Sequence, residues 1–388
     1  MQKIIVVHII TKMELGGAQQ NTLYTVSNLS PQRYKPFLVT GQDGELMDEA
    51  NKIENLFIIK DMVREIRPLK DIKAFFQIVK ALKKIKAQRP VASPILVHTH
   101  SSKAGILGRW AAKAAGIKTV LHSIHGFSFN ESQTLLKKHI YITLEIITSK
   151  ITSHFIAVSS SNIEEGLKYK IFNRQRISLI RSGINISQFK NPKTGKEETR
   201  RNIGIPLDSP VVLMVSCLKP QKAPLDFVKS CSVIKKEIKN SVFVLAGDGE
   251  LRQELENEIK KQGLEDSFHL LGWRRDIPEI INAADVLVLT SRWEGLPRVI
   301  PQAMAASVPV VATKVNGSPE AVKEGENGFL LTPGDISGIA EKTVFLLENP
   351  EKAKKMGQKG SFMVEEFDVH KMVTDQERLY AELLNFTG

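Results

Sequence analysis

The chain has 388 residues, of which 42% are hydrophobic and 25% are charged, a composition typical of a soluble globular protein. This length favours two domains. The two cysteines, Cys217 and Cys231, exclude a disulfide scaffold or a cysteine metal site and fit a reducing cytoplasm. No apolar run reaches the roughly 20 residues that a membrane-spanning helix needs. The start, MQKIIVVHII, is interpreted as a buried strand rather than a signal peptide, because no small-residue cleavage site follows it.

The formal net charge of +12 is unevenly spread, because residues 60–89 carry ten Lys and Arg against three Asp and Glu. Two interpretations stay open: a solvated helix face, or a surface for an anionic partner such as a membrane. Residues 71–86 are predicted to form an amphipathic helix in this region. We expect its apolar stripe to pack on a sheet, with the lysines outside. The stripe consists of Ile72, Phe75, Phe76, Val79, Leu82 and Ile85. The sequence has no aromatic-plus-basic pattern of the kind that binds nucleic acid.

Short, β-branched apolar runs alternate with helical patterns through both halves of the chain. Runs of this kind are typical of parallel strands that helices cover on both faces. The predicted strands of the first half are 3–10, 36–40, 56–59, 95–98, 118–124, 155–158 and 177–180. Those of the second half are 210–216, 242–247, 268–272, 285–290, 308–313 and 328–331.

The pattern predicts an α/β protein with two Rossmann-like parallel-sheet domains. The polar segment 191–209, with Pro192 and Gly195, is predicted to link a first domain at 1–190 to a second at 210–365. Residues 366–388 are predicted to form an amphipathic helix that needs a surface to pack on. Because ligands bind beyond the carboxyl ends of the strands in such sheets, candidate site residues are sought there.

In the first half, two glycines follow a strand, and four histidines cluster at the ends of two strands. Gly16 and Gly17 precede a helical pattern, where they suit either a close approach to a ligand or a simple tight turn. His125 directly follows a strand, which favours contact with a ligand, whereas His98 and His122 are better explained as structural. His100 lies in the same cluster. No metal ligands are predicted, because the sequence lacks Asp-x-Asp, HExxH and zinc-type spacing.

The second half contains three loop motifs, and the strongest is the last. Lys222 suits a phosphate contact or a plain surface position. Gly247 and Gly249 suit the approach of a nucleotide or an ordinary turn. In the last loop, a buried strand is followed by an acidic residue, a glycine and a proline, where an ordinary strand–helix turn would not need all three. The residues of this loop and the helix after it are Ser291, Glu294, Gly295, Leu296, Pro297, Arg298, Val299 and Gln302.

Taken together, these motifs resemble family 4 glycosyltransferases, which have the GT-B fold. The similarity runs nearly from end to end, and it is specific for the family but not for the substrate. It is carried by GGAQ (16–19), HTHSSKAGILGRWAA (98–112), HSIHGF (122–127), LKPQK (218–222), LAGDGELR (245–252), GWRRDIPEIINAADVLVLTSRWEGLPRV (272–299), PVVAT (309–313) and GENGFLLTPGD (325–335).

The resemblance implies a fold in which the two domains face each other across a cleft and the terminal helix crosses back to the first. It also implies a role for each motif. Gly16 and Gly17 would flank the donor diphosphate, and His125 would bond the transferring sugar. Lys222 would neutralise the leaving diphosphate, and Glu294 would hold donor-sugar hydroxyls. The 295–299 amides would bind the phosphates, and position 302 the ribose.

Two residues depart from the family pattern. Cys217 stands where an arginine is frequent, and Gln302 replaces the second glutamate of a Glu-x7-Glu pair. The resemblance implies a cytoplasmic, metal-independent, retaining enzyme that needs no cofactor. It would transfer a sugar from a nucleotide-sugar donor to a glycan or polyprenyl-linked acceptor, in the synthesis of a bacterial surface polysaccharide. The alternative is a non-catalytic nucleotide-sugar-binding protein on the same scaffold, which Cys217 and Gln302 slightly favour.

Overall fold

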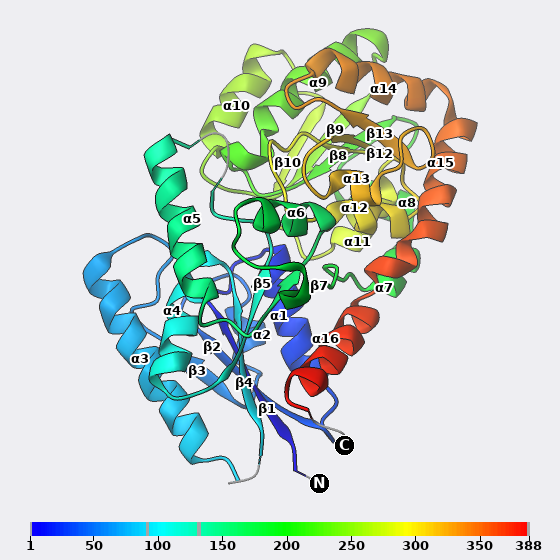
Figure 1. Ribbon diagram of the computed structural model, residues 1–388. Helices are drawn as coiled ribbons and strands as arrows, with labels where there is room; N and C mark the ends of the chain where they lie inside the picture. The colour runs from blue at the N-terminus through cyan, green and yellow to red at the C-terminus, as the bar shows by residue number, and fades with distance from the viewer. Residues whose placement is uncertain (1, 91–92, 130–132, 386–388) are drawn as a thin grey trace. The chain divides into compact units, whose positions relative to one another are not determined.

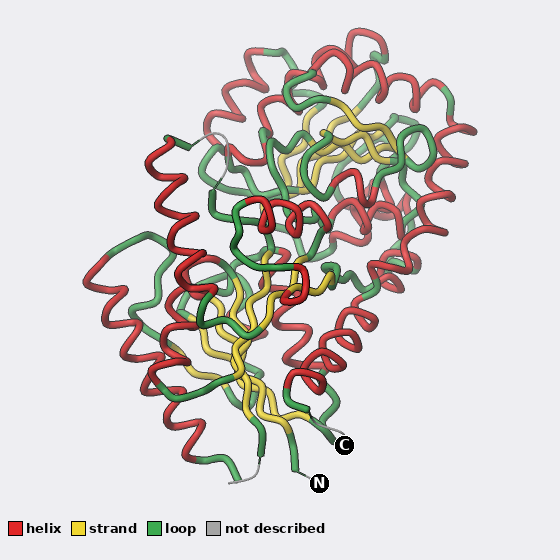
Figure 2. Tube along the Cα trace, in the orientation of Figure 1, coloured by secondary structure: helices red, strands yellow, loops and turns green. Residues whose placement is uncertain are grey.

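The computed structural model describes residues 2–90, 93–129 and 133–385, and this part of the chain divides into two compact units. The first unit contains residues 1–183 together with 369–388, and the second contains residues 184–368. Each unit is built on one parallel sheet covered by helices (Figure 1). Figure 2 shows the strands gathered into two groups, with helices around each.

The first unit has a seven-stranded sheet in the order β3-β2-β1-β4-β5-β6-β7. All of its strand pairs are parallel, and every residue of β1 is buried, as expected for a central strand with helices on both faces. The strands are β1 (Ile4–Ile10), β2 (Tyr34–Thr40), β3 (Leu56–Ile58), β4 (Ile95–His100), β5 (Thr119–Ile124), β6 (His154–Ala157) and β7 (Ile177–Leu179).

Helices cover the two faces of this sheet differently. One face packs against α3 and α4, and the other packs against the last helix, α16 (Val369–Leu383), through Met372, Leu379 and Tyr380. The C-terminal helix therefore returns to the first unit, as the resemblance implied. The helices are α1 (Gly17–Asn28), α2 (Met47–Ala50), α3 (Pro68–Ala87), α4 (Ser102–Ala114), α5 (Leu135–Ser149) and α6 (Ser160–Lys168), with the 3-10 turn η1 (Arg174–Arg176).

The second unit has a six-stranded parallel sheet in the order β10-β9-β8-β11-β12-β13. Its strands are β8 (Val211–Val215), β9 (Val242–Ala246), β10 (Phe268–Gly272), β11 (Val286–Leu289), β12 (Val310–Thr313) and β13 (Gly328–Leu331). Its helices are α7 (Ile186–Lys190), α8 (Lys196–Asn202), α9 (Pro224–Glu237), α10 (Arg252–Lys261), α11 (Ile277–Ala283), α12 (Val299–Ala305), α13 (Ser318–Ala321), α14 (Ile336–Glu348) and α15 (Pro350–Met363), with η2 (Pro220–Lys222) and η3 (Val364–Phe367).

Three features differ from the sequence-based expectations. The segment 191–209, expected as a linker, belongs to the second unit and contains α8, whose Arg200 is buried and bonds the Ala283 carbonyl and Asp285. A polar composition does not distinguish a linker from a helix whose charged side chains bond to the rest of its own domain. The last helix of the first unit begins at Val369 rather than at 366, and residues 386–388 lie outside the described part.

The third difference is the buried face of α3. Ile72 and Phe76 were expected to pack on the sheet, but they are 56% and 64% exposed. The buried residues of this helix are Ala74, Ile78, Ala81, Leu82 and Ile85. Their spacing still follows a helical stripe, but two alanines allow the helix to approach the sheet closely along a different line. As a result, the outer face of α3 is apolar as well as basic.

Candidate active site

In the second unit, the loops after β8 and β11 bring Lys222 and Glu294 together. The Lys222 ammonium lies 2.5 Å from Oε1 of Glu294, and the Ser291 hydroxyl donates to the same oxygen at 2.6 Å. The Glu294 side chain is 6% exposed and that of Lys222 is 19% exposed. Two residues that lie 72 positions apart in the sequence thus form one nearly buried ion pair at the carboxyl ends of neighbouring strands.

Hydrogen bonds to the backbone fix the two loops against each other. The Thr290 hydroxyl lies 3.0 Å from the Lys222 carbonyl oxygen and 2.9 Å from that of Ala223. The side-chain amide of Gln221 donates to the Trp293 carbonyl at 2.8 Å. Ala223 adopts a left-handed conformation with φ 45°, which ends η2 and lets α9 begin at once. The loop that carries Glu294 therefore fixes the backbone position of Lys222.

A third loop, after β12, supports Glu294 from its backbone. The Asn316 side-chain oxygen accepts from the Glu294 amide at 3.1 Å, and the Gly317 amide donates to the Gly295 carbonyl at 3.1 Å. Asn316 has φ 38°, a conformation that asparagine tolerates better than most residues. Sequence analysis did not single out Asn316. The Asn316-Gly317 pair after a strand predicts a turn, but nothing local indicates its partner.

The electrostatics of the pair favour a charged lysine. Burial alone would lower the pKa of the Lys222 ammonium, but the adjacent Glu294 carboxylate, which also accepts its hydrogen bond, raises that pKa above its usual value. Lys222 is consequently a fixed positive charge held with little contact with water. Such a group stabilises negative charge that develops beside it without reorganising.

The loop from Gly295 to Val299 leads into α12. The helix begins at Val299 with Arg298 as its cap, so Pro297 lies just before the helix. Burial lowers the pKa of Arg298 to about 10, which leaves it positively charged at neutral pH. Leu296 is buried. Gln302 is half-buried on α12, and its backbone amide donates to the Arg298 carbonyl.

Gly247 and Gly249 serve the packing between two loops of the second unit. A Cβ at Gly247 would lie 1.8 Å from the Ser216 carbonyl oxygen, and one at Gly249 would lie 2.7 Å from that of Leu218. Their φ angles are 145° and 157°. Of the two interpretations that the sequence allowed, the structural turn has this direct support, and contact with a donor stays a prediction.

The remaining predicted residues, Gly16, Gly17 and His125, belong to the first unit. Gly16 caps α1 in an extended conformation, and Gly17 is the first residue of that helix. His125 follows β5, and its Nε2 atom lies 3.3 Å from Nδ1 of His100. His100 and His125 line one small cavity together with Asn21 of α1.

Behind His125 lies a group of buried histidines on β1 and β4. The imidazole nitrogens of His8, His98 and His100 lie within 4.8 Å of one another, which is a spacing suitable for a metal. The Nδ1 atom of His98 lies 2.6 Å from the Tyr380 hydroxyl, and its Nε2 atom lies 2.8 Å from that of Ser123. His98 therefore uses both nitrogens in hydrogen bonds. The sequence did not single out His8, because it is one histidine within an apolar strand.

Burial keeps these histidines neutral. It lowers the pKa of His8 to about 3. Burial, followed by the nearby imidazoles, also lowers the pKa of His98 and His100 well below the usual value. For His122, which bonds Thr99 at 3.0 Å, burial and then the charge of Arg109 act in the same direction.

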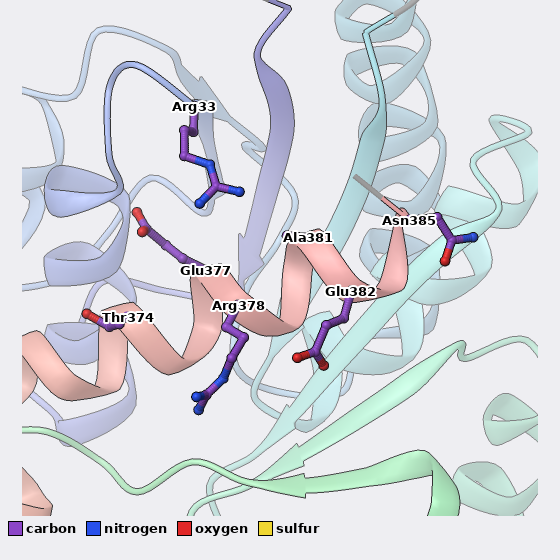
Figure 3. A pocket seen from close by; sticks show the side chains of 7 residues that line it. All are labelled: Arg33, Thr374, Glu377, Arg378, Ala381, Glu382 and Asn385. Carbon is purple, nitrogen blue, oxygen red and sulfur yellow. The ribbon is translucent and has the colours of Figure 1, made fainter. Parts of the chain in front are cut away.

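A separate hollow of about 560 Å³ lies at the outer side of α16 (Figure 3). None of the predicted site residues lines it. Its charged side chains include Arg33, Glu377 and Arg378, of which Glu377 accepts from the Ser30 amide and Arg378 pairs with Asp375. We assign it no role in the chemistry.

Comparison with known proteins places the chain in a family. The family described as Glycosyltransferase Family 4 matches residues 15–188, and that described as Glycosyl transferases group 1 matches residues 195–361. A protein of Escherichia coli, named UDP-Gal:alpha-D-GlcNAc-diphosphoundecaprenol alpha-1,3-galactosyltransferase, is 33% identical over 388 residues, which cover 98% of each chain. The chain is a family 4 glycosyltransferase. The family that the sequence motifs indicated is thereby confirmed.

Other proteins resemble this glycosyltransferase over nearly its whole length. A Campylobacter jejuni protein is 24% identical over 97% of this chain and 98% of its own, and is named GalNAc-alpha-(1->4)-GalNAc-alpha-(1->3)-diNAcBac-PP-undecaprenol alpha-1,4-N-acetyl-D-galactosaminyltransferase. Among solved structures, Anabaena HepE in complex with UDP-glucose has a TM-score of 0.84 at 21% identity, covering 98% of this chain and all of the other. WaaG, a lipopolysaccharide glycosyltransferase, has a TM-score of 0.78 at 16% identity, with 97% and 99% covered. The GT-B fold is confirmed.

The described residues of this glycosyltransferase contain no helix that is both long and apolar enough to cross a membrane.

Proposed function

We propose that this glycosyltransferase transfers a sugar from a nucleotide-sugar donor to a lipid-linked acceptor in the synthesis of a bacterial surface polysaccharide. The Escherichia coli relative, alike over nearly the whole chain, is named for a UDP-galactose donor and a GlcNAc-diphosphoundecaprenol acceptor. The Campylobacter jejuni relative is also named for an undecaprenol-linked acceptor. A UDP-sugar and a diphosphoundecaprenol-linked sugar are consequently the first substrates to test.

The observation that carries this function is the Lys222–Glu294 pair with Ser291. During transfer, the bond between the anomeric carbon and the donor diphosphate breaks, and negative charge grows on the leaving oxygen. The Lys222 ammonium supplies a fixed countercharge for that oxygen, and the backbone amides of 295–299 supply hydrogen bonds. Glu294 accepts from hydroxyls of the donor sugar and so positions its anomeric carbon.

We propose that the new bond forms on the face of the sugar that the diphosphate leaves, so that the anomeric configuration is retained. The acceptor oxygen attacks the anomeric carbon as the leaving bond lengthens, and the acceptor proton passes to the departing phosphate oxygen. His125 contacts the sugar while positive charge develops on it. This route uses positioning and charge stabilisation and does not require a protein nucleophile.

The same site makes a divalent metal unnecessary in this proposal. Lys222 already provides the positive charge that a metal would place at the diphosphate, and Glu294 keeps it protonated. Turnover should accordingly persist in excess EDTA. Complete loss of turnover in EDTA, restored by Mn²⁺ or Mg²⁺, would reject metal independence without touching the transferase assignment.

The deciding experiment combines the purified chain with UDP-galactose and a short-chain GlcNAc-diphosphate lipid, with UDP-glucose and UDP-GalNAc as alternative donors. The coupling constant between H1 and H2 of the product, measured by NMR, shows whether configuration is retained. An inverted product would refute the mechanism. Donor binding without turnover of any acceptor would favour the non-catalytic alternative, to which Cys217 and Gln302 gave slight support.

We further propose that the first unit binds the anionic cytoplasmic face of the cell membrane, where a lipid-linked acceptor resides. Helices α3 and α5 both pack beside α4 (Figure 1), and each has large apolar side chains exposed to solvent. Leu69 is 80% exposed on α3, and Leu135 and Leu136 are 75% and 74% exposed on α5. Exposed lysines accompany them, including Lys73 and Lys137. Apolar side chains ringed by lysine suit a bilayer surface with negative headgroups.

A further inference from the structure

Three neighbouring strands of the first unit place a continuous row of imidazoles behind the candidate site residue His125. His8 lies on β1, His100 on β4 and His125 directly after β5. Nδ1 of His8 lies 3.0 Å from Nε2 of His100, and Nδ1 of His100 lies 3.3 Å from Nε2 of His125. His8 and His100 are 0% and 3% exposed, so water does not compete for these contacts.

Each contact between two neutral imidazoles needs one N–H donor and one bare nitrogen as acceptor. Burial makes the pKa of both His8 and His100 too low for a second proton at neutral pH. Only two arrangements of the protons remain. Either both donors point from His8 toward His125, or both point from His125 toward His8.

The second nitrogen of His8, Nε2, distinguishes between the two proton arrangements. This atom is buried and has no hydrogen-bond partner among the described residues. If the donors pointed toward His8, this nitrogen would carry a buried N–H with no acceptor, which proteins rarely tolerate. In the opposite arrangement it carries only a lone pair, which is less costly to leave unpaired. The first arrangement therefore holds, with the proton of His8 on Nδ1.

The neighbouring imidazole of His98 is fixed independently and does not disturb the row. The Tyr380 hydroxyl donates to Gln376 at 3.0 Å, so it must accept from Nδ1–H of His98. The other nitrogen of His98 then accepts from the Ser123 hydroxyl. Since both nitrogens are occupied in this way, His98 gives no proton to the row and takes none from it.

We propose that His8 and His100 are positioning residues that fix the tautomer of His125. His8 donates to His100, and His100 donates to Nε2 of His125, so neutral His125 carries its proton on Nδ1. His125 then acts toward its ligand as an N–H donor and not as a general base. The effect of this tautomer on catalysis rests on the proposed contact between His125 and the donor sugar, but the tautomer itself does not.

The test reads the tautomer directly, in full-length protein labelled with ¹⁵N-histidine, through the two-bond ¹H–¹⁵N couplings of each imidazole at neutral pH. The signals of His125 are identified by their loss in His125→Gln. Wild type should show protonated Nδ1 and bare Nε2 for His125. His100→Leu should give a mixture of tautomers, whereas His100→Asn, whose amide nitrogen can replace Nδ1 as the donor, should restore the wild-type pattern.

His122→Leu serves as the matched control. It removes an equally buried histidine of β5 that bonds Thr99 and takes no part in the row. His122→Leu should leave the tautomer of His125 unchanged even if it lowers the melting temperature, so a loss of stability is separated from a loss of positioning. A wild-type proton on Nε2 of His125, or an unchanged tautomer in His100→Leu, would overturn the inference. Stoichiometric zinc bound by the purified protein through His8, His98 and His100 would also overturn it, because the metal needs the same nitrogens.

Steady-state kinetics distinguish this inference from the proposed function. His100→Leu should lower kcat about ten-fold, the usual cost of one lost hydrogen bond, with a smaller change in donor KM, and His100→Asn should recover most of it. If the tautomer shifts in His100→Leu while kcat stays at the wild-type value, the row exists but His125 does not act on the sugar. That result would reject the role of His125 and retain the positioning by His8 and His100.

Discussion

Acidification from about pH 7.5 to about pH 5 should destabilise the first unit through its buried histidines. His8 has a folded pKa of about 3 against its usual value of 6.5. Between about pH 3 and pH 6.5, His8 is therefore protonated in the unfolded chain but not in the folded chain. The stabilisation is fully present above pH 6.5 and is lost as the pH falls toward 3. For His8 alone the loss at pH 5 is about 2 kcal/mol. His98, His100 and His122 add losses of the same sign.

Urea unfolding followed by tryptophan fluorescence measures this loss. Of the three tryptophans, Trp110 lies in the first unit, so a Trp273→Phe/Trp293→Phe background reports on that unit alone. A loss of about 2 kcal/mol corresponds to a urea midpoint lower by about 1 M. His8→Leu should reduce the pH dependence by that amount, whereas replacement of the exposed His139 should not. Equal pH dependence in wild type and His8→Leu would refute the reasoning.

Three further predictions concern the second unit and the membrane. Lys222→Ala and Glu294→Ala should each lower kcat/KM by about 10²–10³-fold with little change in fold, and near-wild-type steady-state kinetics in either variant would remove that residue from the mechanism. Asn316→Ala removes the acceptor for the Glu294 amide and should lower kcat/KM by about ten-fold, whereas Asn316→Asp, which keeps an acceptor oxygen, should lose less. Leu135→Ser/Leu136→Ser should weaken co-sedimentation with phosphatidylglycerol vesicles at both low and high salt, and equal binding by wild type and variant would rule out insertion of α5.

The sequence predicted the strands well and the helices less completely. The thirteen strands in the described part of the chain all lie within about two residues of the predicted runs, because a buried parallel strand is continuously apolar and short. Several helices were not identified, among them α5, α6, α8, α11 and α15. The apolar positions of α5 fall on both its buried and its exposed sides, which obscures the helical period, and α15 is rich in lysine and glycine.

For the site, the sequence could place Lys222 and Glu294 on strand-end loops but could not show that they pair. That contact joins residues 72 positions apart, and Asn316 reaches Glu294 across 22 positions. Only the strand order β8-β11-β12 brings these three loops together. The role of His8 was inaccessible for the same reason, because its partner His100 is 92 residues away. The catalytic and donor-binding roles of the predicted residues stay predictions.

The return of α16 to the first unit has a consequence for how the protein is made. The second unit is one continuous stretch, 184–368, whereas the first is made of residues that precede this stretch and residues that follow it. Met372, Leu379 and Tyr380 cover the face of the sheet that displays Ile4 and Val6. During synthesis these side chains leave the ribosome only after the whole second unit has been made. The unit whose translation begins first is therefore completed only after the second unit, and one apolar face of its sheet stays uncovered until α16 has been made.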